Sequence, residues 1–476
     1  MPRANDVSLD SVQYRRFSAS QLDRLMQAAF EILEDIGMRF GEPEAVETLR
    51  RAGATVDGDL VRIPSARVEW ALRAAPKRLA IYNQTGSPAL RLQGRCAWFG
   101  NGSDLPYIID HRTGQRRKAV LQDVRDILQL LEALEHIDFV MSGFLPQDVP
   151  VERSERLQMQ VMLQSTHKPM VYVTTDLENT CRLAAMAEAV AGGEEALRAR
   201  PFAACYINIT NPLRHNPESL QKLIWLARKG LPFDYRPSLI TRGITTPITG
   251  AGFLAVNSAA VLAGLVLAQL VREGAPFIAD SCAGGTFDMS TMVGQLAGPE
   301  IRGFNEDLLH HYGLPGFGNG AMSGSKTVDA QAGMEAALTL LTAVQAGAQL
   351  IHDVGYMDNG ATGSLEQLLI CHDLLGWVKA YMQPLAVEPE TLDLDTVRQV
   401  VATNGNFLGA KTTARHFRRD FYPDLIDRQN FDAWHRDGGL SIRERACTRV
   451  DELLAEPAQT TLSPEQEAAV QAIVDA

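Results

Sequence analysis

A histidine and a carboxylate stand side by side at the end of a short apolar run near the middle of the C-terminal half. The run covers residues 349–355, and it contains His352 and Asp353, with Tyr356 directly after it. A histidine beside a carboxylate can exchange a proton with a substrate or donate a hydrogen bond to it. We predict that His352 is catalytic in one of these senses. The alternative is a core histidine bonded to a backbone carbonyl.

Other apolar runs also end in aromatic and amide side chains. The predicted substrate contacts are Phe99, Asp104, Tyr206, Asn208, Phe317, His352 and Tyr356. A single ring is usually part of a core. Several rings that converge on one opening can form a cage for a cation, because aromatic faces attract desolvated ammonium groups.

The sequence offers little for a metal or a phosphate loop. The six cysteines form no CxxC pair, and His, Asp and Glu do not recur at metal-ligand spacing. The glycine-rich stretch 316–326 lacks the GxxxxGK[ST] pattern. We therefore predict no metal site. Two alternatives stay open: a metal-dependent barrel lyase or hydrolase that uses Asp104, Asp280 and His352, and a non-catalytic ligand-binding barrel.

Eight apolar runs alternate with helix-like segments, and this alternation predicts an α/β fold, specifically a (β/α)8 TIM barrel. In such barrels the functional side chains stand at the carboxyl ends of the strands, which would bring the polar run ends to one mouth. The expected strands are 95–100, 137–144, 169–175, 203–210, 236–241, 276–281, 314–320 and 349–355.

Local signals mark where helices and turns begin. We expect Ser20 to cap the first helix, Asn216-Pro217 to start another, and Ser364 with Gln367 to form a capping box. Residues 121–134 have helical spacing, and 107–120 should form a hairpin that turns at Thr113-Gly114. The expected divisions are an N-terminal helical layer (1–94), the barrel (95–387) and a C-terminal helical extension (388–476) that wraps the barrel or forms an oligomer interface.

One apolar segment is long enough to raise the question of a membrane. Residues 251–271 would span a bilayer by length. Asn257, Ser258 and Gln269 interrupt the segment, however, and a strand-like run follows it, which favours a buried core helix. The first 20 residues contain no apolar signal region, and the net charge of −12 argues against nucleic acid. We expect a cytoplasmic protein and a homo-oligomer.

Long motifs resemble the trimethylamine methyltransferase family, and especially its members without pyrrolysine, such as glycine betaine methyltransferases. The similarity runs from about residue 20 to 455. The matching segments are 246–278, FDM at 287–289, GPE at 298–300, GLP at 313–315, 323–360, 406–418 and 421–434.

The resemblance implies a barrel enzyme that moves a methyl group from a methylated amine to the cobalt of a corrinoid (cobalamin). That corrinoid is carried by a separate protein that docks at the mouth, and this chain itself binds no cofactor tightly. A quaternary ammonium leaves as a neutral amine, so a cobalt(I) nucleophile can displace it without further activation. The protein then has to orient the methyl group and exclude water.

Two departures from the family pattern bear on the substrate. Ala260 stands where we expect a glutamate before VLAG, and residues 316–320 contain no arginine for a substrate carboxylate. His352, Asn208 or Arg302 would have to bind that carboxylate, although Arg302 is expected on a helix that faces solvent. Glycine betaine, choline-like and sulfonium substrates therefore all remain open.

Overall fold

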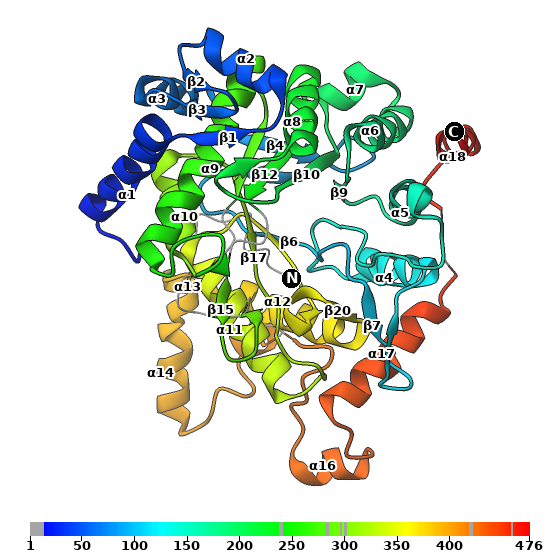
Figure 1. Cartoon of the computed structure of the whole chain (residues 1–476). Coiled ribbons are helices and arrows are strands. Elements are labelled where there is room, and N and C mark those ends of the chain that lie inside the picture. Colours follow the sequence, from blue (N-terminus) through cyan, green and yellow to red (C-terminus); the bar gives the residue numbers. More distant parts are fainter. Residues whose placement is uncertain are drawn as a thin grey trace.

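A sheet of seven parallel strands forms the centre of the protein, in a computed structural model that describes residues 14–237, 241–280, 285–295, 298, 302–417, 422–457 and 460–476 (Figure 1). The strand order is β6-β18-β17-β14-β12-β10-β9, and every neighbouring pair is parallel. The strands are β6 (Trp98–Phe99), β9 (Met170–Val173), β10 (Ala203–Ile209), β12 (Phe233–Pro237), β14 (Phe277–Asp280), β17 (Gly316–Asn319) and β18 (Leu350–His352). The predicted α/β class is confirmed.

The segment predicted as the second strand lies between the two edge strands of this sheet. Phe139 forms an isolated parallel bridge with Gly100, next to β6, and Val140 forms one with Met170 of β9. The amide of Val140 donates to Pro169 O (2.9 Å), and the amide of Val171 donates to Val140 O (2.9 Å). Backbone hydrogen bonds thus reach this segment from both edges of the sheet.

The fifth predicted strand is misplaced in the sequence analysis. The strand is β12, Phe233–Pro237, so it begins before the predicted range 236–241, of which residues 238–240 lie outside the described part. Asp234 and Arg236 alternate with Phe233 and Tyr235, and all four are buried. Because these buried charged side chains interrupt the apolar run, the apolar pattern alone does not reveal this strand.

Helices follow the strands and cover the sheet. They are α4 (Leu121–Ala133), α5 (Val151–Ser165), α6 (Leu177–Ala191), α7 (Glu194–Ala199), α8 (Pro217–Lys229), α9 (Gly250–Val271), α10 (Phe304–Tyr312), α11 (Ala330–Ala346) and α12 (Leu365–Tyr381). Asn216 precedes α8 with Pro217 in its first turn, as predicted. The side chain of Ser364 accepts a hydrogen bond from the amide of Gln367 at the start of α12, but the side-chain oxygen of Gln367 accepts none among the described residues, so the predicted capping box is only half formed.

The N-terminal residues form a small α/β layer and a hairpin. The layer contains α1 (Ala19–Glu31), a π-helical turn (Ile32–Ile36), β1 (Met38–Phe40), α2 (Pro43–Arg51), β2 (Thr55–Asp57), β3 (Leu60–Arg62) and α3 (Ser65–Ala74). Ser18 caps α1, not Ser20 as predicted, because Gln21 completes the capping box three residues later. The hairpin β4 (Leu79–Tyr82) and β5 (Pro88–Leu92) packs Ile81 and Leu90 against Trp98, Phe317 and Leu350.

Helix α9 is the long apolar segment that could have been a membrane span. Among the described residues it is the one helix long and apolar enough to cross a bilayer, and 89% of its most apolar window is buried inside the protein. Its Gly264 lies against the ring of Tyr235 on β12. It is therefore a core helix whose partners are the sheet and the N-terminal layer.

Short strands stand around the carboxyl ends of the central sheet. They are β7 (Tyr107–Ile109), β8 (Arg116–Lys118), β11 (Arg214–His215), β13 (Thr241–Arg242), β15 (Gly285–Asp288), β16 (Val293–Gln295), β19 (Tyr356–Met357) and β20 (Thr362–Ser364). The predicted hairpin is β7–β8, and Gly114 takes a φ of +70° in its turn. β13, β15 and β16 form a separate sheet beyond β12 and β14.

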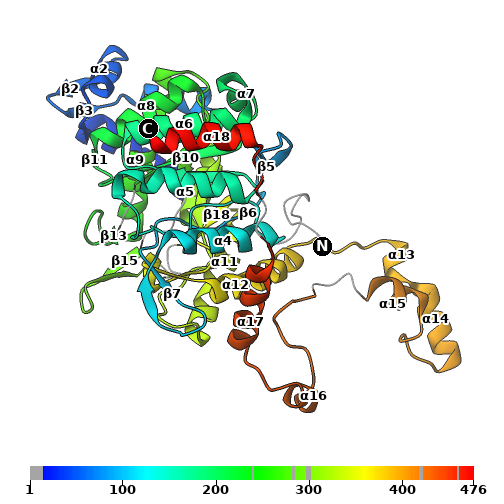
Figure 2. The ribbon, with the colours of Figure 1, turned by 90° about the vertical axis from the view of Figure 1, so that its right-hand side faces the viewer.

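The C-terminal part consists of helices. They are α13 (Pro389–Leu392), α14 (Leu394–Thr403), α15 (Lys411–His416), α16 (Phe431–Arg436), α17 (Ile442–Ala455) and α18 (Pro464–Asp475). α17 packs on α4 and α12, and α18 packs on α5 and α6. In contrast, α13, α14 and α15 project from the body (Figure 2).

Candidate functional site

Inward-facing side chains form a polar layer at the carboxyl ends of the parallel strands. Side chains alternate along a strand, so Tyr235, which contacts α9, sets Asp234 and Arg236 on the opposite face. The strand register places Asn208 beside Arg236, and Asn319 beside His352. The neighbouring Asp280 lies beside Phe317. Amide, guanidinium, carboxylate and imidazole groups thus come from five adjacent strands.

Three rings pack together within this layer. The ring centroids of His352 and Phe317 are 4.6 Å apart, and those of Tyr206 and Phe317 are 5.7 Å apart in an edge-on arrangement. Tyr206 and His352 are separated by 5.9 Å. The structure therefore brings together three of the predicted substrate contacts, and we call Tyr206, Phe317 and His352 the ring cluster.

Hydrogen bonds define the protonation of His352. Its Nδ1 lies 2.6 Å from Gly318 O, which can only accept, so Nδ1 carries the ring proton. Its Nε2 lies 3.2 Å from Arg236 Nη1, which can only donate, so Nε2 accepts. Burial lowers the pKa of His352 to about 4. The charge of Arg236 lowers this pKa further, whereas the charge of Asp353 raises it. His352 is therefore neutral near pH 7.

A neutral ring changes the meaning of the contact with Asp353. Nε2 of His352 lies 3.2 Å from Asp353 Oδ1, but without a proton on Nε2 this contact is no ion pair. Asp353 also accepts from the side-chain amide of Asn319 at 3.5 Å. His352 is thus held by a carbonyl and a guanidinium, which suits an orienting hydrogen-bond group better than a proton donor.

Two buried charged residues of β12, Asp234 and Arg236, were not predicted, and Arg236 contacts the ring cluster. Its Nη2 lies 3.5 Å from Asp280 Oδ1, and its guanidinium lies 4.8 Å from the centroid of the Tyr206 ring. Beside it, the side-chain oxygen of Asn208 is buried and has no hydrogen-bond partner among the described residues. Alternating burial along 233–237 is the signal that would have found Arg236.

Asp104 and Tyr356 form a second group in the loops after β6 and β18. The hydroxyl of Tyr356 donates to Ser103 O, and the Ser103 hydroxyl donates to Asp104 Oδ2 at 3.1 Å. The side chain of Asp104 is exposed to solvent, but many protein atoms lie around its carboxyl group. The resulting loss of hydration raises the pKa of this carboxyl. Asp104 and Asp353 both adopt positive φ, at +63° and +71°, a conformation that is uncommon for residues other than glycine.

Phe99 and Arg302 do not lie where the sequence analysis expects them. The Phe99 ring lies in the outer core with Lys379 Nζ 5.0 Å from its centroid, whereas its neighbour Trp98 faces inward. Arg302 precedes α10 and does not face solvent. It is buried, and it donates to the backbone and side-chain oxygens of Asn319 at 3.1 and 3.2 Å.

Comparison with known proteins identifies the family. The family model described as Trimethylamine methyltransferase (MTTB) matches residues 4–476. The chain belongs to the trimethylamine methyltransferase (MTTB) family. It is therefore a methyltransferase.

Two relatives and one solved structure illustrate the similarity. The trimethylamine methyltransferase MttB of Desulfitobacterium hafniense (strain DSM 10664 / DCB-2) is 31% identical over 100% of this chain and 96% of its own. The glycine betaine methyltransferase of Desulfitobacterium hafniense (strain Y51) is 28% identical over 97% of each chain. The monomethylamine methyltransferase (MtmB) of Methanosarcina barkeri superposes with a TM-score of 0.46 at 11% identity, covering 94% of this chain and 90% of its own.

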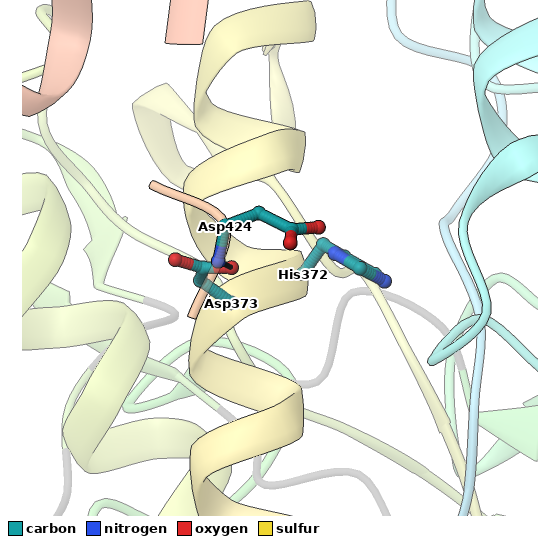
Figure 3. Close-up of side chains that lie close together, drawn as sticks. All are labelled: His372, Asp373 and Asp424. Carbon is teal, nitrogen blue, oxygen red and sulfur yellow. Dashed lines mark hydrogen bonds between the residues drawn. The ribbon is translucent and has the colours of Figure 1, made fainter. Parts of the chain in front are cut away.

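A cluster of possible metal ligands lies away from this layer. The ligand atoms of His372, Asp373 and Asp424 lie within 4.8 Å of one another, the one such group found among the described residues (Figure 3). Asp373 already accepts the amides of Asp424, Leu425 and Ile426 at 3.0, 2.7 and 2.9 Å. The cluster thus fastens the chain at 424–426 to α12. The trio of the rival metal hypothesis, Asp104, Asp280 and His352, is not among these groups in the described part.

Proposed function

We propose that this methyltransferase acts in the cytoplasm and moves a methyl group from a small quaternary amine of the glycine betaine type to the cobalt of a corrinoid carried by a separate protein. The family assignment supports the reaction class, and a relative named glycine betaine methyltransferase supports the donor class. The substrate proposal depends on one observation, that Arg236 lies beside the ring cluster. Glycine betaine carries a carboxylate, which needs a cation, and a quaternary ammonium, which needs aromatic faces.

We further infer that the fold is a closed eight-stranded barrel. In this barrel, Phe139 and Val140 would belong to the eighth strand, which pairs with each edge of the sheet through a single β-bridge. Closure would turn the polar layer into the floor of one mouth, with Asp104 and Tyr356 at its side.

The chain's own residues would bind and orient the substrate. The guanidinium of Arg236 can hold a carboxylate through two parallel hydrogen bonds, and the side chain of Asn208 lies beside it in the strand register. The methylated nitrogen would then rest against Tyr206, the partly exposed ring of the cluster, with Asp353 balancing its charge. Arg236 thus takes the role of the arginine that is absent from 316–320.

The partner's corrinoid would supply the cobalt(I) nucleophile that accepts the methyl group. The exposed apolar side chains of the sheet β13–β15–β16 and its flanks fit the docking of such a partner at this end of the molecule. They are Ile244, Ile248, Met289, Met292 and Val293, and we call them the rim. Because the amine leaves neutral, no protein group needs to deliver a proton, which agrees with a neutral His352.

The test is methyl transfer from a panel of amines to free cob(I)alamin and to corrinoid proteins, followed by cobalamin absorbance and by detection of the demethylated amine. We expect glycine betaine to react and to yield dimethylglycine, choline to react more slowly, and trimethylamine to be inert. Transfer from trimethylamine alone, or no transfer at all together with stoichiometric bound zinc or manganese, would contradict the proposal.

A further inference from the structure

Asp234 carries a buried carboxyl group to which the proposed function gives no role. The residue is 1% exposed, and neither of its carboxyl oxygens has a hydrogen-bond partner among the described residues. An ionised carboxylate that is buried without hydrogen bonds is strongly unfavourable. Such a group therefore either keeps a proton or bonds to a ligand, and its place in the site decides which ligand it can meet.

The strand register places Asp234 beside the proposed position of the methylated nitrogen. Asp234 pairs across the sheet with Tyr206, the ring against which that nitrogen would rest. Neighbouring strands lie about 4.7–4.9 Å apart. Arg236 stands two residues further along β12 and on the same inner face, where it would hold the carboxylate of the substrate. One strand thus presents a group to each end of a betaine.

The surroundings of Asp234 favour its protonated form. The groups that face it are Tyr206 on β10, Ile278 and Asp280 on β14, and Arg236 on its own strand. The guanidinium of Arg236 lies 3.5 Å from Asp280 Oδ1. Burial raises the pKa of Asp234 well above its ordinary value, Asp280 raises it further, and Arg236 lowers it. The carboxyl group therefore keeps its proton in the empty site.

Two other titratable groups of the layer already have partners. The proton on Nδ1 of His352 is bonded to Gly318 O at 2.6 Å, and the carboxylate of Asp280 lies against Arg236. The proton of Asp234, in contrast, has no acceptor among the described residues. It is the proton of this layer that can be given away without breaking a hydrogen bond.

We propose that Asp234 keeps its proton while the quaternary amine is bound and gives it to the product nitrogen after the methyl group has left. This inference rests on the proposed function. When the carbon–nitrogen bond breaks, its electron pair stays on nitrogen, so no proton is needed for that step. Pyramidal inversion then turns the lone pair away from the departed methyl group. A new N–H bond forms, the O–H bond of Asp234 breaks, and the lone pair that could take the methyl group back is gone.

The experiment measures the protons released when glycine betaine and dimethylglycine bind to the full chain, without any corrinoid. Calorimetry in buffers of different ionisation enthalpy counts these protons. Dimethylglycine carries a proton on nitrogen near neutral pH, so its complex with protonated Asp234 holds one proton too many. Glycine betaine has no N–H group. We expect dimethylglycine to release close to one proton more than glycine betaine does.

Infrared difference spectra give a second readout of the same carboxyl group. The carbonyl stretch of a protonated carboxylic acid should be present in the glycine betaine complex and lost in the dimethylglycine complex. Asp234→Asn should lack this band and should remove the difference in proton release. It should weaken dimethylglycine binding about tenfold, because an ionic hydrogen bond is lost, and change glycine betaine affinity less than threefold. Retained glycine betaine affinity would show that the variant is folded.

Glu366→Gln is the matched control. The carboxyl group of Glu366 is also buried with neither oxygen hydrogen-bonded among the described residues, but it lies 3.6 Å from Arg443 of α17. This variant should keep the difference in proton release. Equal proton release by the two ligands in the wild type, or a difference that survives in Asp234→Asn, would overturn the role of Asp234 alone. Failure of both ligands to bind would overturn the proposed function and this inference with it.

Discussion

Arg236 is the residue on which substrate choice should depend. Arg236→Lys keeps a positive charge beside Asp280 but loses the two-pronged geometry that matches a carboxylate. We expect kcat/KM for glycine betaine to fall about 10- to 100-fold, which corresponds to about 1–3 kcal/mol. Choline has no carboxylate, so its rate provides the internal control and should change less than threefold. Equal losses for both substrates would show that Arg236 supports the fold and not the carboxylate.

His352 should orient the site without exchanging protons. Its pKa of about 4 lies below the ordinary value, so the ring gains a proton only as the pH falls toward 4. We expect kcat to be flat between about pH 5.5 and 8 with respect to this residue. His352→Gln should keep that flat profile while losing about tenfold in rate. A wild-type acid limb near pH 6.5 that vanishes in His352→Gln would instead establish His352 as an acid or base.

Individual residues show which parts of the candidate site could be predicted from the sequence and which could not. Tyr206, Phe317 and His352 are predictable because each stands in an apolar run that becomes a buried strand. Phe99 was expected in the polar layer but lies in the outer core. Successive side chains of a strand face opposite sides, so a shift of one position moves a side chain from the layer to the outer core. Arg236 was missed because a buried charge interrupts the apolar pattern by which strands are found.

Elements with local start signals are predictable for a physical reason. Pro217 fits the first turn of α8, Ser364 accepts from the amide of Gln367, and Gly114 takes a positive φ in its turn, so neighbouring sequence specifies all three. The bridging segment at Phe139 and Val140 depends on both sheet edges, which are remote in sequence. Its extent as a strand therefore could not be read from its apolar residues.

Helix α9 offers a test of packing between elements. A Cβ at position 264 would overlap the ring of Tyr235, whereas a Cβ at Gly333 of α11 would meet nothing within 4 Å. Gly264→Ala should therefore destabilise the protein by about 1–3 kcal/mol through overpacking. Gly333→Ala should be neutral or slightly stabilising, since alanine is the better helix former. Urea unfolding of the two variants checks this, and equal midpoints would show that α9 can shift away from the sheet.

The rim is an exposed apolar surface of the whole molecule, and it should serve the methyl acceptor. Met289 is 77% exposed on the rim, so Met289→Glu leaves the core intact while placing a charge on the docking surface. We expect kcat/KM measured with a corrinoid protein to fall about tenfold, a loss of about 1.4 kcal/mol in partner binding. Transfer to free cob(I)alamin should be unchanged, because that small acceptor needs no docking surface. Tyr381→Glu, at an exposed position in the last turn of α12 at the other end of the strands, should change neither rate. If Met289→Glu lowers both rates equally, the rim shapes the mouth itself and the partner docks elsewhere.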